Sequence, residues 1–156
     1  MRFTITAAAL LSLAGLVSSA QVPAGSHASM QPDIKWGPAP PIFPAGAEMA
    51  VLQGDPSSNS VFTVRLRFPD GYKIAPHTHP TDENVTVISG TFKLAMGKTF
   101  DANGMTALTA GGFVTAPANM AHYAQAQGTT IVQVHAVGPF ALTYVNPADT
   151  PKAVSR

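Results

Sequence analysis

Apolar and polar residues alternate along several short segments of the chain. The clearest case is 61–68, which places Phe62, Val64, Leu66 and Phe68 on one face and Thr63, Arg65 and Arg67 on the other. Side chains in a strand point alternately to its two faces, so this period of two predicts a half-buried strand. The segment 69–71, Pro-Asp-Gly, then predicts a turn.

Further short apolar segments separated by turn residues predict more strands. Segments 85–88 and 91–96 flank Ser89 and Gly90, a dipeptide typical of a tight hairpin. Four more strands are expected at 113–115, 121–126, 131–137 and 140–145, and a turn at 101–104. No long segment after residue 20 has a helical period without Gly or Pro in it. Many short strands with turns between them predict a single all-β domain, a barrel or a sandwich.

The first twenty residues have the pattern of a signal peptide. A positive start is followed by an apolar run at 7–17, and small residues at 18–20 offer a cleavage site. The run is shorter than the roughly 20 residues that a membrane span needs. The alternative, a buried N-terminal helix, lacks an amphipathic pattern. We therefore expect an exported protein, periplasmic or secreted, whose mature chain begins near Gln21.

Composition divides the remaining chain and limits its chemistry. Residues 21–44, rich in Pro, Gly, Ser and Ala, predict an extended arm with little packing of its own, in which Ile34 and Trp36 can contact the domain. We expect the barrel at 45–147 and a short tail at 148–156. Removing Arg2 with the leader leaves a net charge near zero, so nothing points to nucleic acid or to a membrane surface after cleavage. The chain has no cysteine, so only histidine and carboxylate ligands remain for a metal.

Three histidines and one glutamate form the most informative pattern. His77 and His79 stand two apart with a proline on each side, so in an extended segment both imidazoles point to the same side. Glu83 follows, and His122 begins a later predicted strand. Three imidazoles and one carboxylate suit one divalent transition metal ion: Fe, Mn, Ni, Co, Cu or Zn.

These residues resemble the two sequence motifs of the cupin superfamily. The first motif is matched at every spacing by Gly71, His77, His79, Glu83 and Gly90, and the second is matched by Gly111, Pro117 and His122. Asn119 replaces a motif glycine and Ala126 replaces the final asparagine. Since asparagine tolerates positive φ better than most residues, we expect the turn at Asn119 to persist.

The resemblance implies a fold, a ligand set and an open question. Cupins are jelly-roll barrels of two antiparallel sheets, with a metal inside the open end held by residues that correspond to His77, His79, Glu83 and His122. Four protein ligands on an ion that prefers six leave two positions for a small oxygen-rich molecule, or for one substrate atom and O₂. A tetrahedral zinc ion would instead close the site and give it a structural or sensory role. A cupin that has lost its metal is a further alternative.

Other candidates depend on which face of a strand they occupy. His135 shares a face with Gln133, and this face lies either in the barrel lining or in solvent. In the lining, His135 would be a candidate proton acceptor, as Glu83 would be. We expect Phe62, Val64, Leu66, Phe92 and Leu94 to line the barrel. The methionines at 96, 105 and 120 are expected as core filler.

Three functions fit this pattern, because a fold does not fix a function. The first is an enzyme, dioxygenase- or lyase-like, that acts on a small oxygen-rich molecule. The second is a module that binds or senses a metal or a small ligand without chemistry, which the scarcity of acid–base groups favours. The third is a zinc-binding sensor domain beside a regulatory protein, whose start the segments at 36–38, 44–47 and 52–55 loosely resemble; the leader argues against it. A homodimer is expected only because cupins often pair.

Overall fold

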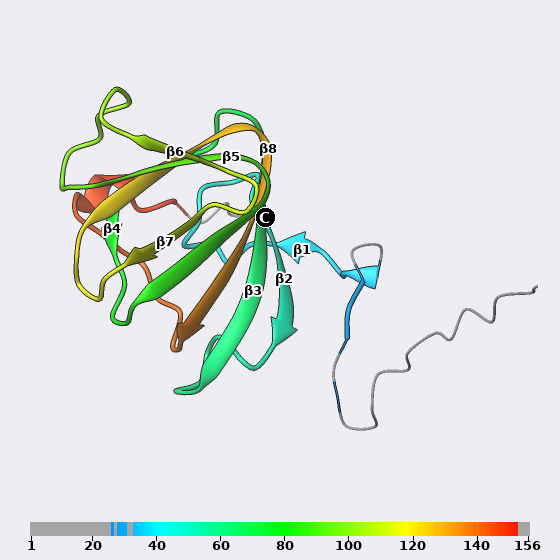
Figure 1. The fold of residues 1–156 in the computed structure, drawn as a ribbon. Helices are drawn as coiled ribbons and strands as arrows, with labels where there is room; N and C mark the ends of the chain where they lie inside the picture. Colours follow the sequence, from blue (N-terminus) through cyan, green and yellow to red (C-terminus); the bar gives the residue numbers. More distant parts are fainter. Residues whose placement is uncertain (1–25, 27, 31–32, 153–156) are drawn as a thin grey trace, which may run out of the picture.

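The computed structural model describes residues 26, 28–30 and 33–152. Its strands are β1 (Gly37–Pro38), β2 (Glu48–Gln53), β3 (Val61–Phe68), β4 (Lys73–Thr78), β5 (Glu83–Met96), β6 (Thr106–Thr109), β7 (Phe113–Ala116), β8 (His122–Val137) and β9 (Thr143–Tyr144), followed by a 3-10 turn, Pro147–Asp149. They curl into a barrel (Figure 1), which confirms the prediction of a single all-β barrel. The predicted leader at 1–20 lies outside the described residues. Within the described part of the chain, no helix is long and apolar enough to cross a membrane.

Strand β8 connects the parts of the barrel. It pairs antiparallel with β3, β4 and β5, and the sheet continues from β3 to β2 and β1 and from β4 to β9. The first half of β8 pairs with β4, whereas the second half pairs with β3. Strand β5 runs beside both halves and carries β6 and β7 on its other side. Residues distant in sequence therefore meet where β4, β5 and β8 come together.

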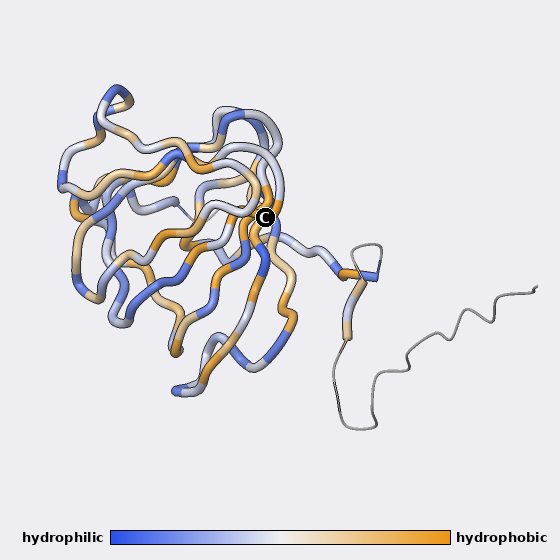
Figure 2. The backbone as a smooth tube through the Cα atoms, viewed as in Figure 1, coloured by the Kyte–Doolittle hydropathy of each residue, from blue (hydrophilic) through white to orange (hydrophobic). Residues whose placement is uncertain are grey.

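The alternation in β3 sets its inner face as predicted. Phe62, Val64, Leu66 and Phe68 are at most 2% exposed and belong to the hydrophobic core. The outward Arg67 forms an ion pair with Glu48 at 2.6 Å and stacks over the Trp36 ring at 4.5 Å. Figure 2 shows the same alternation of apolar and polar positions along the backbone. The apolar interior excludes water from whatever polar groups the barrel holds.

The hairpin predicted at Ser89 and Gly90 is wrong. Strand β5 continues through both residues, and its pairing with β8 shifts register between Val87 and Thr91. Gly90 has φ +78°, and a Cβ atom there would lie 2.5 Å from the carbonyl oxygen of Thr129. The dipeptide is therefore a bulge that bends β5 against β8. The local signals of a bulge and of a turn are alike, and the partner strand decides between them.

The segment before residue 45 packs against the barrel more closely than an extended arm would. Gly37–Pro38 pairs with β2, and Ile34 and Phe43 are buried. The hydroxyl of Tyr144 donates a hydrogen bond to the carbonyl oxygen of Ile42 at 2.9 Å. The sheet thus begins before the predicted boundary at 45. Proline and glycine in this segment prevent a long strand but do not prevent burial.

Asn119 adopts the positive φ that its place in the second motif predicts, with a value of +60°. Its backbone N–H donates a hydrogen bond to the carbonyl oxygen of His79 at 2.8 Å, and Met120 closes the turn by donating to Pro117. A residue that tolerates the left-handed backbone conformation is therefore needed where the chain turns back toward the segment after β4.

Replacing Asn119 tests this turn. Asn119→Val is expected to lower the free energy of unfolding by about 1–2 kcal/mol, because a β-branched residue is strained at positive φ. Asn119→Gly should retain the stability of the parent, since glycine adopts this conformation freely. Chemical denaturation of both variants measures the difference. Equal losses for Val and Gly would contradict the explanation.

Candidate metal centre

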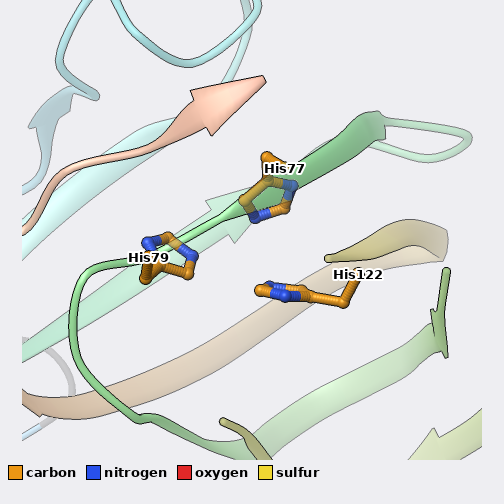
Figure 3. Close-up of side chains that lie close together, drawn as sticks. All are labelled: His77, His79 and His122. Atoms are coloured by element: carbon orange, nitrogen blue, oxygen red, sulfur yellow. The ribbon is translucent and has the colours of Figure 1, made fainter. Parts of the chain in front are cut away.

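Three strands bring the motif residues together. His77 in β4 lies directly opposite His122, the first residue of β8, in the antiparallel pairing. His79 follows β4, and Glu83 is the first residue of β5. Figure 3 shows the three imidazoles pointing toward a common centre. As predicted from the spacing of two, His77 and His79 point to the same side of their segment.

The imidazoles are close, and the whole group is buried. One ligand atom from each of His77, His79 and His122 lies within 4.8 Å of the others. The ring centroids of His77 and His122 are 4.3 Å apart, and those of His79 and His122 are 5.3 Å apart. The exposed fractions of these histidines and of Glu83 lie between 2% and 8%. Side chains of this type are rarely buried together without a partner that offsets the loss of water.

Backbone carbonyl groups fix which nitrogen of each ring is available. Nδ1 of His77, His79 and His122 lies 2.8, 2.8 and 3.1 Å from the carbonyl oxygens of Ala75, Ala141 and Met120, respectively. A carbonyl oxygen only accepts, so each Nδ1 must donate. In a neutral ring, Nε2 is then left with a lone pair. These contacts are the outer hydrogen bonds that orient histidine ligands at metal sites.

The inward nitrogens lack hydrogen-bond partners. Nε2 of His79 and Nε2 of His122 are buried and make no hydrogen bond among the described residues. Oε2 of Glu83 lies 3.5 Å from Nε2 of His79 and 3.4 Å from Nε2 of His122. Buried polar atoms without partners are rare because each costs free energy. The three histidines can hold a metal ion, whose bonds would use these lone pairs.

Burial and mutual charge set the protonation of the group. Burial, with the neighbouring histidines, lowers the pKa of His77 to about 3, so this ring is neutral. Burial also opposes protonation of His79, but the adjacent Glu83 carboxylate outweighs it and raises the pKa of His79. Burial alone would raise the pKa of Glu83. The neighbouring His122 and His79 stabilise its carboxylate more strongly, so this pKa lies well below its usual range. The donors are thus an ionised carboxylate and imidazoles, a set suited to transition metals.

The group lies at one wall of a small apolar cavity inside the barrel. The centre of a water molecule can move in only about 20 Å³ of it. The other lining residues are Phe43, Leu66, Phe68, Ile74, Val85, Phe92, Leu94, Ala124, Val132, Val134 and Leu142. Leu66, Phe92 and Leu94 line the cavity as expected, whereas Phe62 and Val64 lie in the core beside it. Such a space can hold water but not the body of a larger molecule.

Two of the lining residues that the sequence did not predict come from segments outside the long strands. Phe43 belongs to the segment interpreted as an arm, and Leu142 follows β8. Two residues before Leu142, Phe140 stacks on the ring of His79, with centroids 5.3 Å apart and planes 14° apart. Only long-range packing brings these segments over the site, so no local sequence signal identifies them.

His135 does not reach this cavity. It is exposed, and its Nδ1 lies 3.0 Å from Oγ1 of Thr63 on the neighbouring strand. The residues on either side of Gln133, Val132 and Val134, point inward and line the cavity. The interpretation of His135 as a lining residue is therefore wrong, because the apolar positions of this strand occupy the other face. Asp82 is also exposed, and its Oδ1 accepts a hydrogen bond from the backbone of Ala118 at 2.7 Å.

Solved structures with the same fold include several named proteins. An acetylacetone dioxygenase from Acinetobacter johnsonii is 15% identical, with a TM-score of 0.61, and the similarity covers 86% of this chain and 87% of that one. The polyketide cyclase RemF from Streptomyces resistomycificus is 15% identical, with a TM-score of 0.64 and coverages of 81% and 89%. An RmlC-like cupin from Shewanella frigidimarina is 18% identical, with a TM-score of 0.57 and coverages of 72% and 91%. At these identities the likeness concerns the fold alone.

Sequence comparison identifies the family. No curated protein sequence matches the chain. A family model described as the ChrR cupin-like domain matches residues 26–141, which is more than half of the chain and includes both cupin motifs. The chain therefore belongs to the ChrR cupin-like domain family of the cupin superfamily.

Proposed function

We propose that this protein binds one divalent transition metal ion through His77, His79, Glu83 and His122 and is an enzyme that acts on a small oxygen-rich molecule, in a dioxygenase- or lyase-like reaction. The observation that carries the proposal is the convergence of the imidazoles on one buried point. Their Nδ1 atoms are held by backbone carbonyl groups, and two inward Nε2 atoms are buried without hydrogen-bond partners. A metal ion would use these lone pairs.

The four ligands define what the bound ion can offer. Since many of the candidate ions prefer six ligands, two positions remain for oxygen atoms of a substrate. A divalent ion and one carboxylate give the site a charge of about +1, which favours anionic or enolisable ligands. A bound ion would supply Lewis-acid polarisation of an oxygen atom, or redox chemistry if it were iron, manganese or copper.

The protein's own side chains provide positioning and exclude water. The stack of Phe140 on His79 and the hydrogen bond from His79 to Ala141 hold this ring in place. Among the described residues, Glu83 is the only carboxylate that lines the cavity. With His135 outside the cavity, Glu83 is the remaining candidate proton acceptor of the two named from the sequence.

A second candidate function, a metal-binding or sensing module without catalysis, is favoured by the small size of the cavity and the burial of its ligands. The space inside is about 20 Å³, and the four ligands are at most 8% exposed. A tetrahedral zinc ion held by all four residues would leave no position for a substrate. The acetylacetone dioxygenase and the polyketide cyclase among the solved structures favour catalysis only through their fold.

The metal site is tested by removing one ligand. Wild-type protein dialysed against a divalent metal is expected to retain about one ion per chain, whereas His79→Ala should retain much less, because one of four donors is lost. Metal content is measured by plasma mass spectrometry. The control is His135→Ala, which removes an exposed imidazole and should retain the wild-type content.

Glu83 and its sequence neighbour Asp82 provide a second comparison between a proposed ligand and a residue that is not a ligand. Glu83→Gln should weaken metal binding by about tenfold or more, since even outer partners of metal ligands contribute that much. Asp82→Asn keeps an oxygen that can accept from Ala118 and should have no such effect. Full metal content in both His79→Ala and Glu83→Gln would refute the ligand assignment.

Catalysis is tested with the metal-loaded protein. Oxygen uptake is expected with a 1,3-diketone or a diphenol, and it should disappear in His79→Ala. An oxygen electrode measures the rate, and product analysis of anaerobic reactions detects a lyase. A tightly held, four-coordinate zinc ion together with no turnover of any such compound would favour the non-catalytic module instead.

We further propose that residues 1–20 direct export and are removed. The positive start, the short apolar run and the small residues at 18–20 support this proposal. Protein purified from the native cells is expected to start at Gln21 and to be enriched in the periplasmic or secreted fraction, as measured by intact mass and fractionation. A cytoplasmic protein that retains Arg2 would contradict it.

A further inference from the structure

The cavity beside the metal ligands is too small for the body of an organic substrate. The centre of a water molecule can move in only about 20 Å³ of the cavity, whereas small-molecule sites typically have volumes of about 300–1,000 Å³. A larger molecule that reaches the ligands must therefore place most of its atoms elsewhere. A hollow that shares a wall with the cavity is the place to search.

A larger groove lies next to the cavity on the side of β6 and β7. Its volume is about 570 Å³, within the range of about 300–1,000 Å³ that is typical of small-molecule sites. We call it the β6–β7 groove; its lining residues are Leu94, Ala95, Met96, Gly104, Thr106, Leu108, Phe113, Val114, Thr115, Pro117 and Met120.

The β6–β7 groove and the cavity have one lining residue in common. Leu94 lines both hollows. Met96, also in the groove, lies opposite His122 in the pairing of β5 with β8. The carbonyl oxygen of Met120 accepts the hydrogen bond that fixes the His122 ring. A molecule in the groove therefore lies close to one of the metal ligands.

The chemistry of the groove selects an uncharged ligand. None of its lining residues carries a charge, and the sequence has no Asp, Glu, Lys or Arg between Asp101 and Asp149. Phe113, Met120 and Met96 are 58%, 48% and 41% exposed, so the expectation that Met96 and Met120 are core filler is wrong. Methionine side chains adapt to irregular apolar ligands and contact aromatic rings favourably. A charged ligand would lose water here without gaining a partner.

Other hollows in the described part of the chain fit less well. One of about 240 Å³ shares Phe43 with the cavity, but it is smaller and Lys152 lines it. Another of about 590 Å³ surrounds His135 and contains Asp82, and it shares no lining residue with the cavity. The β6–β7 groove alone among these combines size, an uncharged apolar lining and a wall in common with the metal ligands.

We propose that the β6–β7 groove binds the uncharged apolar body of a small molecule whose oxygen-bearing end reaches the metal ligands past Leu94, an inference that rests on the proposed function. An aryl or alkyl ketone has this chemistry. Leu94 then separates the apolar part of the ligand from the reacting part and limits which molecules pass.

The test uses one substitution that fills the groove and a matched one that does not. Thr106→Trp places a large ring in the groove from an exposed position of β6. Thr109→Trp makes the same change on the same strand, also at an exposed position, but outside the groove lining. The probes are Nile red, an uncharged apolar dye, followed by fluorescence, and 1-phenylbutane-1,3-dione, followed by calorimetry with the full chain.

Wild type and Thr109→Trp are expected to bind both probes, and Thr106→Trp should bind them at least about tenfold more weakly. Nile red binding should persist in His79→Ala, because the groove does not need the metal. If metal binding fails but this pattern holds, the groove stands without the proposed function. Equal affinity in both Trp variants, or no binding of either probe, overturns the proposal. A concentration-dependent dimer that Thr106→Trp dissociates, with no probe bound, would assign the groove to a second copy instead.

Discussion

The burial of three imidazoles and one carboxylate around a single point is the constraint on which this structure depends. His77, His79 and His122 present nitrogen atoms to one another inside an apolar barrel, and Glu83 lies beside two of them. Each outer nitrogen bonds to a backbone carbonyl group, so the rings cannot turn without breaking a hydrogen bond. Such a group is costly to bury without a partner, and a metal ion is a partner that satisfies all of it.

The barrel supplies this arrangement through pairings between distant segments. Strand β8 pairs with β4 and with β5, and these contacts bring together residues from both cupin motifs. The resemblance to the cupin motifs grouped the side chains that meet here, and the positive φ of Asn119 was predictable from its place in the second motif. Local periodicity alone does not predict that residues from the two motifs lie together; the family resemblance does.

Two of the predictions that were wrong share a physical cause. Ser89 and Gly90 have the local signals of a hairpin, but pairing with β8 along the whole of β5 makes them a bulge. Phe43 packs over the cavity although its neighbours in sequence suggest a loose arm. Both outcomes depend on long-range partners, whereas the orientation of His135 did not. The apolar alternation of Val132 and Val134 already indicates that His135 lies on the opposite face.

The direct test of this account is the coordination of the bound ion, observed by anomalous diffraction from crystals of the metal-loaded protein. The account predicts one ion bound by imidazole nitrogens of His77, His79 and His122 and by an oxygen of Glu83, at about 2.0–2.2 Å if the metal is zinc. An ion held elsewhere on the chain, with the three histidines free of metal, would contradict it.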